Sequence, residues 1–224
     1  MVGYWRYPPL TLLTTHYSLL KYWYADTLFA KGKKLNEANQ NNQAFEKLQT
    51  AVQLNPGEPF FHDELSRVAA ELAVAAHQQG EASLSAELVD LALAESDRTL
   101  EITPTHLNYW KNRTRVFFTL AEIDKEYQQD ALASLLQATE LAPTDAKVFY
   151  NLAVLYGRLG QNQTAIETLE KTIELKPNYE TARWALALFY EQEGNLENAK
   201  NELEYILERI NPKNKKVKEK LEAL

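Results

Sequence analysis

Apolar residues recur at three- and four-residue steps along residues 145–177, and this stretch sets the pattern that the rest of the chain repeats. Such steps place apolar side chains on one face of a helix. The first half of the stretch predicts one such face, made of Phe149, Leu152, Ala153 and Tyr156. The second half predicts another, made of Ala165, Ile166, Leu169, Thr172 and Ile173. Gly160 separates the two helices. Pro177 ends the second, because proline lacks an N–H and disfavours helical backbone in the residue before it.

This helical hairpin occurs five times along the chain. A proline closes the second helix of each unit, at positions 56, 104, 143, 177 and 212, after the similar segments AVQLNP, TLEITP, ATELAP, TIELKP and ILERINP. The array spans residues 21–212, with units at 21–56, 57–104, 105–143, 144–177 and 178–212. The unit at 57–104 is the longest, so we expect about two extra turns on each of its helices. Helix N-caps are predicted at Asn41 or Asn42, at Ser83 or Ser85, and at Thr105.

The two ends of the chain depart from the repeat. Residues 1–20 lie outside it and begin an aromatic-rich region that contains Tyr4, Trp5, Tyr7, Tyr17, Tyr22, Trp23, Tyr24 and Phe29. One interpretation is an N-terminal cap that covers the exposed end of the array. The other is a juxtamembrane segment, because Tyr and Trp beside Arg6 and Lys21 are typical of a membrane–water interface. Residues 213–224 predict a capping helix with one apolar stripe, made of Val217, Leu221 and Leu224.

The 34-residue unit resembles a tetratricopeptide repeat. It combines that period with a mid-unit glycine, a closing proline and two small residues, Ala153 and Ala165, which let the two helices approach closely. The resemblance implies an all-α, right-handed superhelical solenoid of about five repeats. It also implies a non-catalytic scaffold for protein–protein interaction.

Polar residues lie where the first helix of each unit should face the inner, concave side of a stacked array. They are Asn108, Lys111, Asn112 and Arg115 in the third unit, Lys147, Tyr150, Asn151 and Arg158 in the fourth, and Trp184 in the fifth. Asn112 and Asn151 occupy equivalent positions, so we expect adjacent amides that hydrogen-bond the backbone of an extended peptide. The cations would bind a carboxylate or an acidic segment. This arrangement resembles the asparagine and basic clamp of some tetratricopeptide domains.

The alternative interpretation is a solvated face held by internal ion pairs. The second unit has Asp63 and Glu64 in the positions where a clamp would need amides or cations. Glu64 could then pair with Arg67 or with Arg115. Arg113 replaces an apolar packing residue, and it is expected either to extend its charged end to solvent or to pair with Asp97 or Glu101.

Composition excludes several classes of function. A net charge of −7 argues against a nucleic-acid-binding protein, and the absence of cysteine excludes disulfides and thiolate metal sites. The four histidines are scattered, and there is no glycine-rich phosphate loop. We therefore expect no catalytic residues, no metal and no cofactor. No apolar run approaches the ~20 residues that span a bilayer, and no secretory signal is present.

A wider resemblance covers residues 21–224. The segments KYWYADTLFAKG, LNPGEPFFHDELSRVAAELA and NYWKNRTRVFF are similar to the C-terminal tetratricopeptide tails of bacterial O-antigen ligase and polymerase-like membrane proteins. The resemblance implies a docking role in cell-surface polysaccharide assembly. It also implies a soluble domain tethered to a membrane, with the aromatic N-terminus following a membrane helix; otherwise the protein is expected in the cytoplasm. A structural or oligomerisation module at a membrane is the alternative to a partner-binding groove. The partner, the side of the membrane and the oligomeric state are left open.

Overall fold

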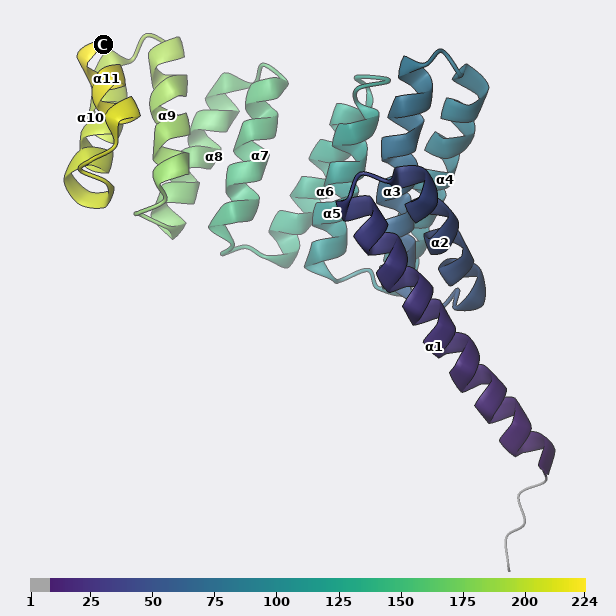
Figure 1. The fold of residues 1–224 in the computed structure, drawn as a ribbon. Coiled ribbons are helices and arrows are strands. Elements are labelled where there is room, and N and C mark those ends of the chain that lie inside the picture. Colours follow the sequence, from purple (N-terminus) through teal and green to yellow (C-terminus); the bar gives the residue numbers. More distant parts are fainter. Residues whose placement is uncertain (1–8) are drawn as a thin grey trace, which may run out of the picture. The chain divides into compact units, whose positions relative to one another are not determined.

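The computed structural model describes the backbone of residues 9–224 and the side chains of residues 16–224. Tyr4, Trp5, Arg6 and Tyr7 therefore lie outside the described side chains. Within the described range every regular element is a helix, which confirms the all-α fold class (Figure 1). The chain divides into two compact parts, each larger than one repeat. We call them unit 1, ending at Tyr127, and unit 2, from Gln128 to Leu224; single repeats are called hairpins from here on.

Unit 1 contains two helical hairpins and a fifth helix. Helix α1 spans Pro9–Glu37 and packs against α2, Asn41–Leu54; α3, Pro59–Gln78, packs against α4, Ala82–Ile102. Helix α5, Leu107–Leu120, lies against α3. Helices α3 and α4 have 20 and 21 residues, whereas α2 and α5 have 14 each, which confirms the predicted extra length of the second hairpin.

Unit 2 continues the same pattern. It contains all but the first residue of α6, Tyr127–Leu141. The next helices are α7, Ala146–Arg158; α8, Asn162–Leu175; α9, Glu180–Gln192; and α10, Leu196–Tyr205, which runs into a π-helical turn, Ile206–Ile210. Helices α7 and α8 form one hairpin, and α9 and α10 form the next, with α8 against α9. The last helix, α11, spans Lys215–Glu222 and packs on α10. Its Val217 side chain is buried with Ala187, Leu203 and Ile206.

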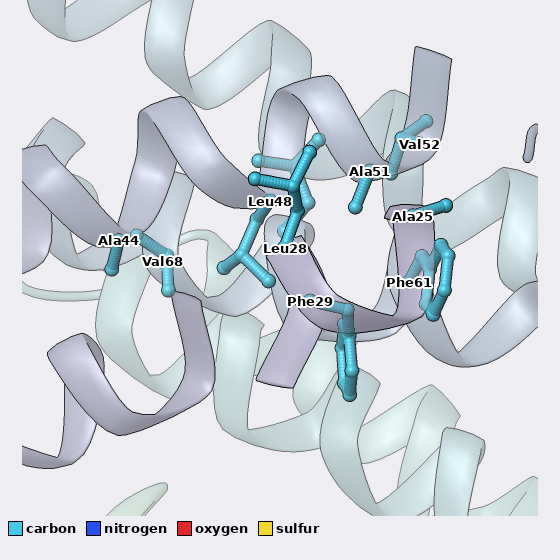
Figure 2. Packing of buried hydrophobic residues seen from close by; sticks show 10 residues of the cluster. Ala25, Leu28, Phe29, Ala44, Leu48, Ala51, Val52, Phe61 and Val68 are labelled. Carbon is cyan, nitrogen blue, oxygen red and sulfur yellow. The ribbon is translucent and has the colours of Figure 1, made fainter. Parts of the chain in front are cut away.

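The apolar clusters lie between the two helices of a hairpin and against the helix that follows it. In unit 1, Leu28 and Phe29 of α1 meet Leu48 of α2 and Phe61 of α3 in one apolar cluster (Figure 2). The rings of Phe29 and Phe61 stack with centroids 4.7 Å apart. Gly32 allows the close approach of α1 and α2, because a Cβ there would lie 2.8 Å from Leu48 Cγ. In unit 2, Ala153 and Ala165 are both fully buried.

The turn after the first helix of a hairpin has the same geometry four times. Asn39, Gly80, Gly160 and Gly194 all have positive φ. The residue after each donates its backbone N–H to a carbonyl five positions earlier, as Gln161 does to Tyr156 at 2.9 Å. This is the Schellman motif, which satisfies carbonyl groups at a helix C-terminus. Gly160 is therefore a conformational requirement of the turn, as the sequence predicted.

Several predicted helix starts are wrong. Helix α1 begins at Pro9, well before residue 20. The predicted caps of α2 and α4 lie inside those helices, whose N-cap positions are Gln40 and Glu81. Ser85 Oγ instead donates to the Ala73 carbonyl oxygen at 2.9 Å and so joins α4 to α3. Thr105 is not the cap of α5, because the N-cap position is His106. Several neighbouring polar residues near a helix start can serve as its N-cap, and tertiary packing decides which of them does so.

Candidate functional site

A groove crosses the first helices of the hairpins in unit 1. It has a volume of about 560 Å³, and α1, α3 and α5 contribute its walls. Its lining residues are Lys33, Phe60, Asp63, Glu64, Arg67, Glu71, Asn112, Arg115, Phe118 and Thr119. We call this feature the unit 1 groove. It contains two of the predicted site residues, Asn112 and Arg115.

The floor of the unit 1 groove is a hydrogen-bonded carboxyl group. Asp63 is only 8% exposed, and Asn112 Nδ2 donates to its Oδ2 at 2.6 Å. Burial raises the pKa of Asp63 from 3.8 to about 7, although the Asn112 hydrogen bond and the Arg67 and Arg115 charges oppose the rise. The nearby Glu64 charge raises the pKa further. The Asp63 carboxyl can therefore exchange a proton near neutral pH.

One wall of the groove is an internal ion-pair network. The Arg67 guanidinium pairs with Glu64 one turn earlier, and it also donates to Glu71 Oε1 at 2.9 Å. Asn41 of α2 donates to the other Glu71 oxygen at 3.1 Å. The alternative of internal pairing is thus confirmed for Glu64 and Arg67. Arg115 differs, because its side chain is exposed and no described carboxylate lies within ion-pair distance of it.

Two aromatic side chains border the groove. Phe60 is 42% exposed at the start of α3, and the Lys33 ammonium of α1 lies 5.8 Å from its ring centroid. Phe118 is half-buried on α5. A cation and a ring at this spacing attract each other electrostatically. The groove therefore offers cationic, amide and apolar contacts side by side.

The remaining predicted residues are distributed over both units. Asn108 is exposed and Lys111 half-buried on α5, but neither lines the unit 1 groove. In unit 2, Lys147 and Arg158 lie at the two ends of α7, where Lys147 is exposed and Arg158 is part of the last turn, and Asn151 is half-buried. Because Asn112 and Asn151 belong to different units, the adjacency of their amides stays a prediction.

Two predicted aromatic residues of unit 2 pack against other side chains. The Tyr150 ring lies 5.4 Å from the Tyr179 ring between centroids. Trp184 packs against the apolar cluster around Val217, and the Lys216 ammonium lies 4.7 Å from its ring centroid. Both side chains thus have a structural role in addition to any contact with a partner.

Arg113 behaves as the sequence predicted. Its guanidinium pairs with Asp97 Oδ1 at 2.6 Å and lies 4.9 Å from the Phe117 ring centroid. It also donates to Ser96 Oγ at 3.0 Å. Of the two predicted partners, Asp97 is therefore confirmed.

Sequence reasoning missed Lys33, Phe60 and Phe118 as groove residues. Lys33 and Phe60 belong to the first helices of their hairpins. Asn112 was identified because the first helix of each repeat should face the inner side of the array, and the same reasoning applied to the first two repeats would have found Lys33 and Phe60. The sequence signal for these residues was weak, because an exposed Lys or Phe at a single helix position is common in proteins.

No described His, Asp or Glu side chains form a group of three that could hold a metal ion. Within the described range, every helix is too short or too polar to cross a bilayer.

Comparisons with known proteins agree with this architecture. A tetratricopeptide repeat family model matches residues 134–167. The chain is 25% identical over 114 residues to the small glutamine-rich tetratricopeptide repeat-containing protein 2 of Mycosarcoma maydis, and the match covers 51% of this chain. It spans 31% of the length of that relative.

Solved structures show the same fold. MamA from Desulfovibrio magneticus RS-1 matches with a TM-score of 0.60 and 19% identity, over 89% of this chain and 95% of that one. TTC0263, a thermophilic TPR protein of Thermus thermophilus, matches with a TM-score of 0.53 and 22% identity, over 89% and 97%. YrrB, described as a TPR protein with an unusual peptide-binding site, matches with a TM-score of 0.58 and 16% identity, over 88% and 91%.

The class of this protein follows from these findings. Its fold is that of the tetratricopeptide repeat solenoids, and the repeat resemblance is supported by both kinds of comparison. Proteins of this class generally mediate protein–protein interaction. The further resemblance to O-antigen ligase tails rests on the sequence segments alone.

Proposed function

We propose that this protein is a non-catalytic scaffold that binds an extended segment of a protein partner along the first-helix faces of its hairpins. In unit 1 the contacts are Asn108, Lys111, Asn112 and Arg115. In unit 2 they are Lys147, Tyr150, Asn151, Arg158 and Trp184. The observation that carries the proposal is the unit 1 groove, where the exposed Arg115 lies in no direct ion pair among the described residues and shares the lining with an amide and two aromatic rings.

The chemistry of the groove suits a peptide. The Asn112 amide has a carbonyl oxygen in addition to the Nδ2 group that binds Asp63, and this oxygen can accept from a peptide N–H. Arg115 can form a charge-assisted hydrogen bond with a carboxylate. Phe60 and Phe118 provide apolar area for a side chain of the ligand. The likeness in fold to YrrB supports this assignment.

The test is selection of binders from a display library of short random peptides on the immobilised protein. Lys111→Glu/Arg115→Glu should lose the selected peptides, while the helical circular dichroism spectrum is retained. The control Lys200→Glu/Lys218→Glu makes the same change in charge at exposed positions of unit 2. Equal peptide binding by both variants would refute the groove as the binding site.

A second candidate function is a structural module tethered at a membrane or to a second copy of the chain. The observation in its favour is a row of exposed aromatic residues on α1, including Tyr17 and Trp23. Together with the resemblance to O-antigen ligase tails, it would place the module beside an enzyme of polysaccharide assembly. Deleting residues 1–20 should then change the sedimentation mass or release the protein from membranes. An unchanged sedimentation mass together with unchanged membrane association after the deletion would reject this candidate.

A further inference from the structure

Residues 16–24 of α1 form a helical segment that contributes no side chain to the core of unit 1. Helix α1 has 29 residues, whereas α2, against which it packs, has 14. At about 1.5 Å per residue, α1 is therefore about twice as long as α2. Figure 1 shows α1, in dark purple, projecting past α2 as a straight rod. None of residues 16–24 is buried, and the first buried residue of the described side chains is Ala25.

Large apolar side chains surround this projecting segment. Tyr17, Leu20 and Trp23 are 70%, 65% and 66% exposed. The full set is Tyr17, Leu19, Leu20, Tyr22, Trp23 and Tyr24. Because successive residues of a helix are about 100° apart, these six positions occupy most of the circumference. A pair of helices needs a single apolar seam, so the distribution fits an apolar medium better than a second copy of the chain.

The charge of the segment differs from that of the rest of the protein. Residues 1–34 contain five Lys or Arg and one Asp, a net charge of +4, whereas the whole chain carries −7. The remaining residues therefore carry −11. Lys31 and Lys34 line a hollow together with Trp23 and Asp26, so two cations, one carboxylate and an aromatic ring share one face of α1. This charge is complementary to an anionic surface, which repels the acidic remainder of the chain.

We propose that residues 16–24 of α1 insert into the headgroup layer of an anionic lipid bilayer. This inference rests on the second candidate function and deepens it by naming the partner. The rings of Tyr17, Tyr22, Trp23 and Tyr24 lie at the boundary between headgroups and acyl chains, where Tyr and Trp are enriched in membrane proteins. The Lys21 ammonium extends to the lipid phosphates.

Geometry sets the depth of insertion. Tyr17 and Tyr24 are seven residues apart, about 10 Å along the helix axis, which is comparable to the depth at which interfacial helices bury their apolar side chains. Lys31 and Lys34 follow on the same helix and remain at the bilayer surface. There they gain from the negative surface potential, which acts over a distance of about 10 Å at moderate salt.

The test is flotation of the complete 224-residue chain with lipid vesicles. Two vesicle types are compared, pure phosphatidylcholine and an equimolar mixture of phosphatidylcholine and phosphatidylglycerol. The protein should float with the anionic vesicles, and Trp fluorescence should shift to the blue. Lys21→Gln/Lys31→Gln/Lys34→Gln should weaken the binding by about fivefold for each lysine removed.

A matched pair of variants distinguishes insertion of α1 into the bilayer from non-specific adsorption through any exposed apolar side chain. Leu19→Gln/Leu20→Gln/Trp23→Gln replaces three apolar side chains that are 67%, 65% and 66% exposed, so the circular dichroism melt should be unchanged while vesicle binding is lost. Leu136→Gln/Leu188→Gln/Leu196→Gln alters three leucines that are 41%, 37% and 43% exposed in unit 2, and it should bind vesicles like the original protein. Lys111→Glu/Arg115→Glu, which disables the proposed groove, should also bind vesicles normally.

Three results would overturn the inference. One is failure of the unaltered protein to float with anionic vesicles. Another is equal flotation with neutral vesicles, which would remove the role of charge. The third is a lipid-free dimer by sedimentation that becomes a monomer on Leu19→Gln/Leu20→Gln/Trp23→Gln, with no vesicle binding; this would assign the segment to a second copy of the chain. Each result leaves the peptide-binding test of the groove unaffected.

Discussion

Asn112 of α5 donates a hydrogen bond of 2.6 Å to the buried carboxyl group of Asp63 on α3. These residues lie 49 positions apart in sequence, and each was expected to face the same inner surface. The contact engages one donor of an amide that was predicted to bind a partner. Because α3 and α5 belong to different hairpins, the protonation of Asp63 also depends on the packing of these two hairpins.

The first prediction concerns the pH dependence of stability. Because burial raises the pKa of Asp63 to about 7 from 3.8, the folded protein binds this proton more readily than the unfolded chain. The favourable contribution is present below pH of about 4 and is lost as the pH rises through about 7. Asp63→Asn keeps an acceptor for Asn112 but cannot ionise. The variant should gain stability over the original protein as the pH rises, by on the order of 2–4 kcal/mol.

Urea unfolding at about pH 5 and about pH 8 measures this difference. His62 also has a raised pKa, since the hydrogen bonds to Glu95 and the Pro56 carbonyl outweigh the lowering effect of burial. Its contribution cancels, because both proteins contain it. Asp90→Asn, at an exposed position of α4, is the control for loss of one charge. A difference between Asp63→Asn and the original protein that is independent of pH would contradict the assignment.

The second prediction concerns close helix packing in unit 2. A Cβ at Gly157 would lie 2.2 Å from Phe189 Cζ, so either the Phe189 ring or the helix that carries it must shift if this residue is alanine. Gly157→Ala should destabilise the protein by about 1–3 kcal/mol through overpacking. Phe189→Leu should recover part of the loss in the double variant, which thermal unfolding can measure. Gly160→Ala is the contrasting case, because it meets no atom within 4 Å and acts only through its φ of +74°.

The third prediction concerns a buried ion pair between α9 and α10. Arg183 is 8% exposed; its guanidinium pairs with Glu202 at 2.5 Å, and its Nε donates to the Pro177 carbonyl at 2.7 Å. Arg183→Met leaves Glu202 as a half-buried charge without its partner and should cost about 3–5 kcal/mol. Arg183→Met/Glu202→Leu should recover most of this in denaturant unfolding. A double variant no more stable than Arg183→Met would show that the stacking of Arg183 on Tyr205 is the larger effect.

The fourth prediction concerns the last helix. Val217 is 1% exposed beneath α11, so Val217→Asp would bury an unpaired charge and detach this helix. In a repeat array each hairpin is stabilised by its neighbours. Hydrogen exchange should therefore accelerate in α9 and α10 and remain unchanged in α3 and α4. Uniform acceleration along the whole chain would indicate a single cooperative unit.

The sequence determined the local architecture, because the signals for it are short-range. Three- and four-residue apolar steps define helices, Gly160 supplies the positive φ of the turn, and Pro177 prevents the second helix from continuing. The closing proline recurs in every repeat, and a residue with positive φ recurs at Asn39, Gly80 and Gly194. The all-α class, the hairpin repeat and the long second hairpin could therefore be predicted without coordinates.

The tertiary structure alone decided which polar side chains hydrogen-bond within the protein and which face solvent. Asn112 and Arg115 look equally available in the sequence, yet one is bonded to Asp63 and the other is exposed at the groove. The same holds for α1, whose Ala25, Leu28 and Phe29 enter the core while Trp23 is 66% exposed. The reason is physical. Helical periodicity depends on neighbours within two turns, whereas burial, ion pairing and a raised pKa depend on residues brought together from distant parts of the chain.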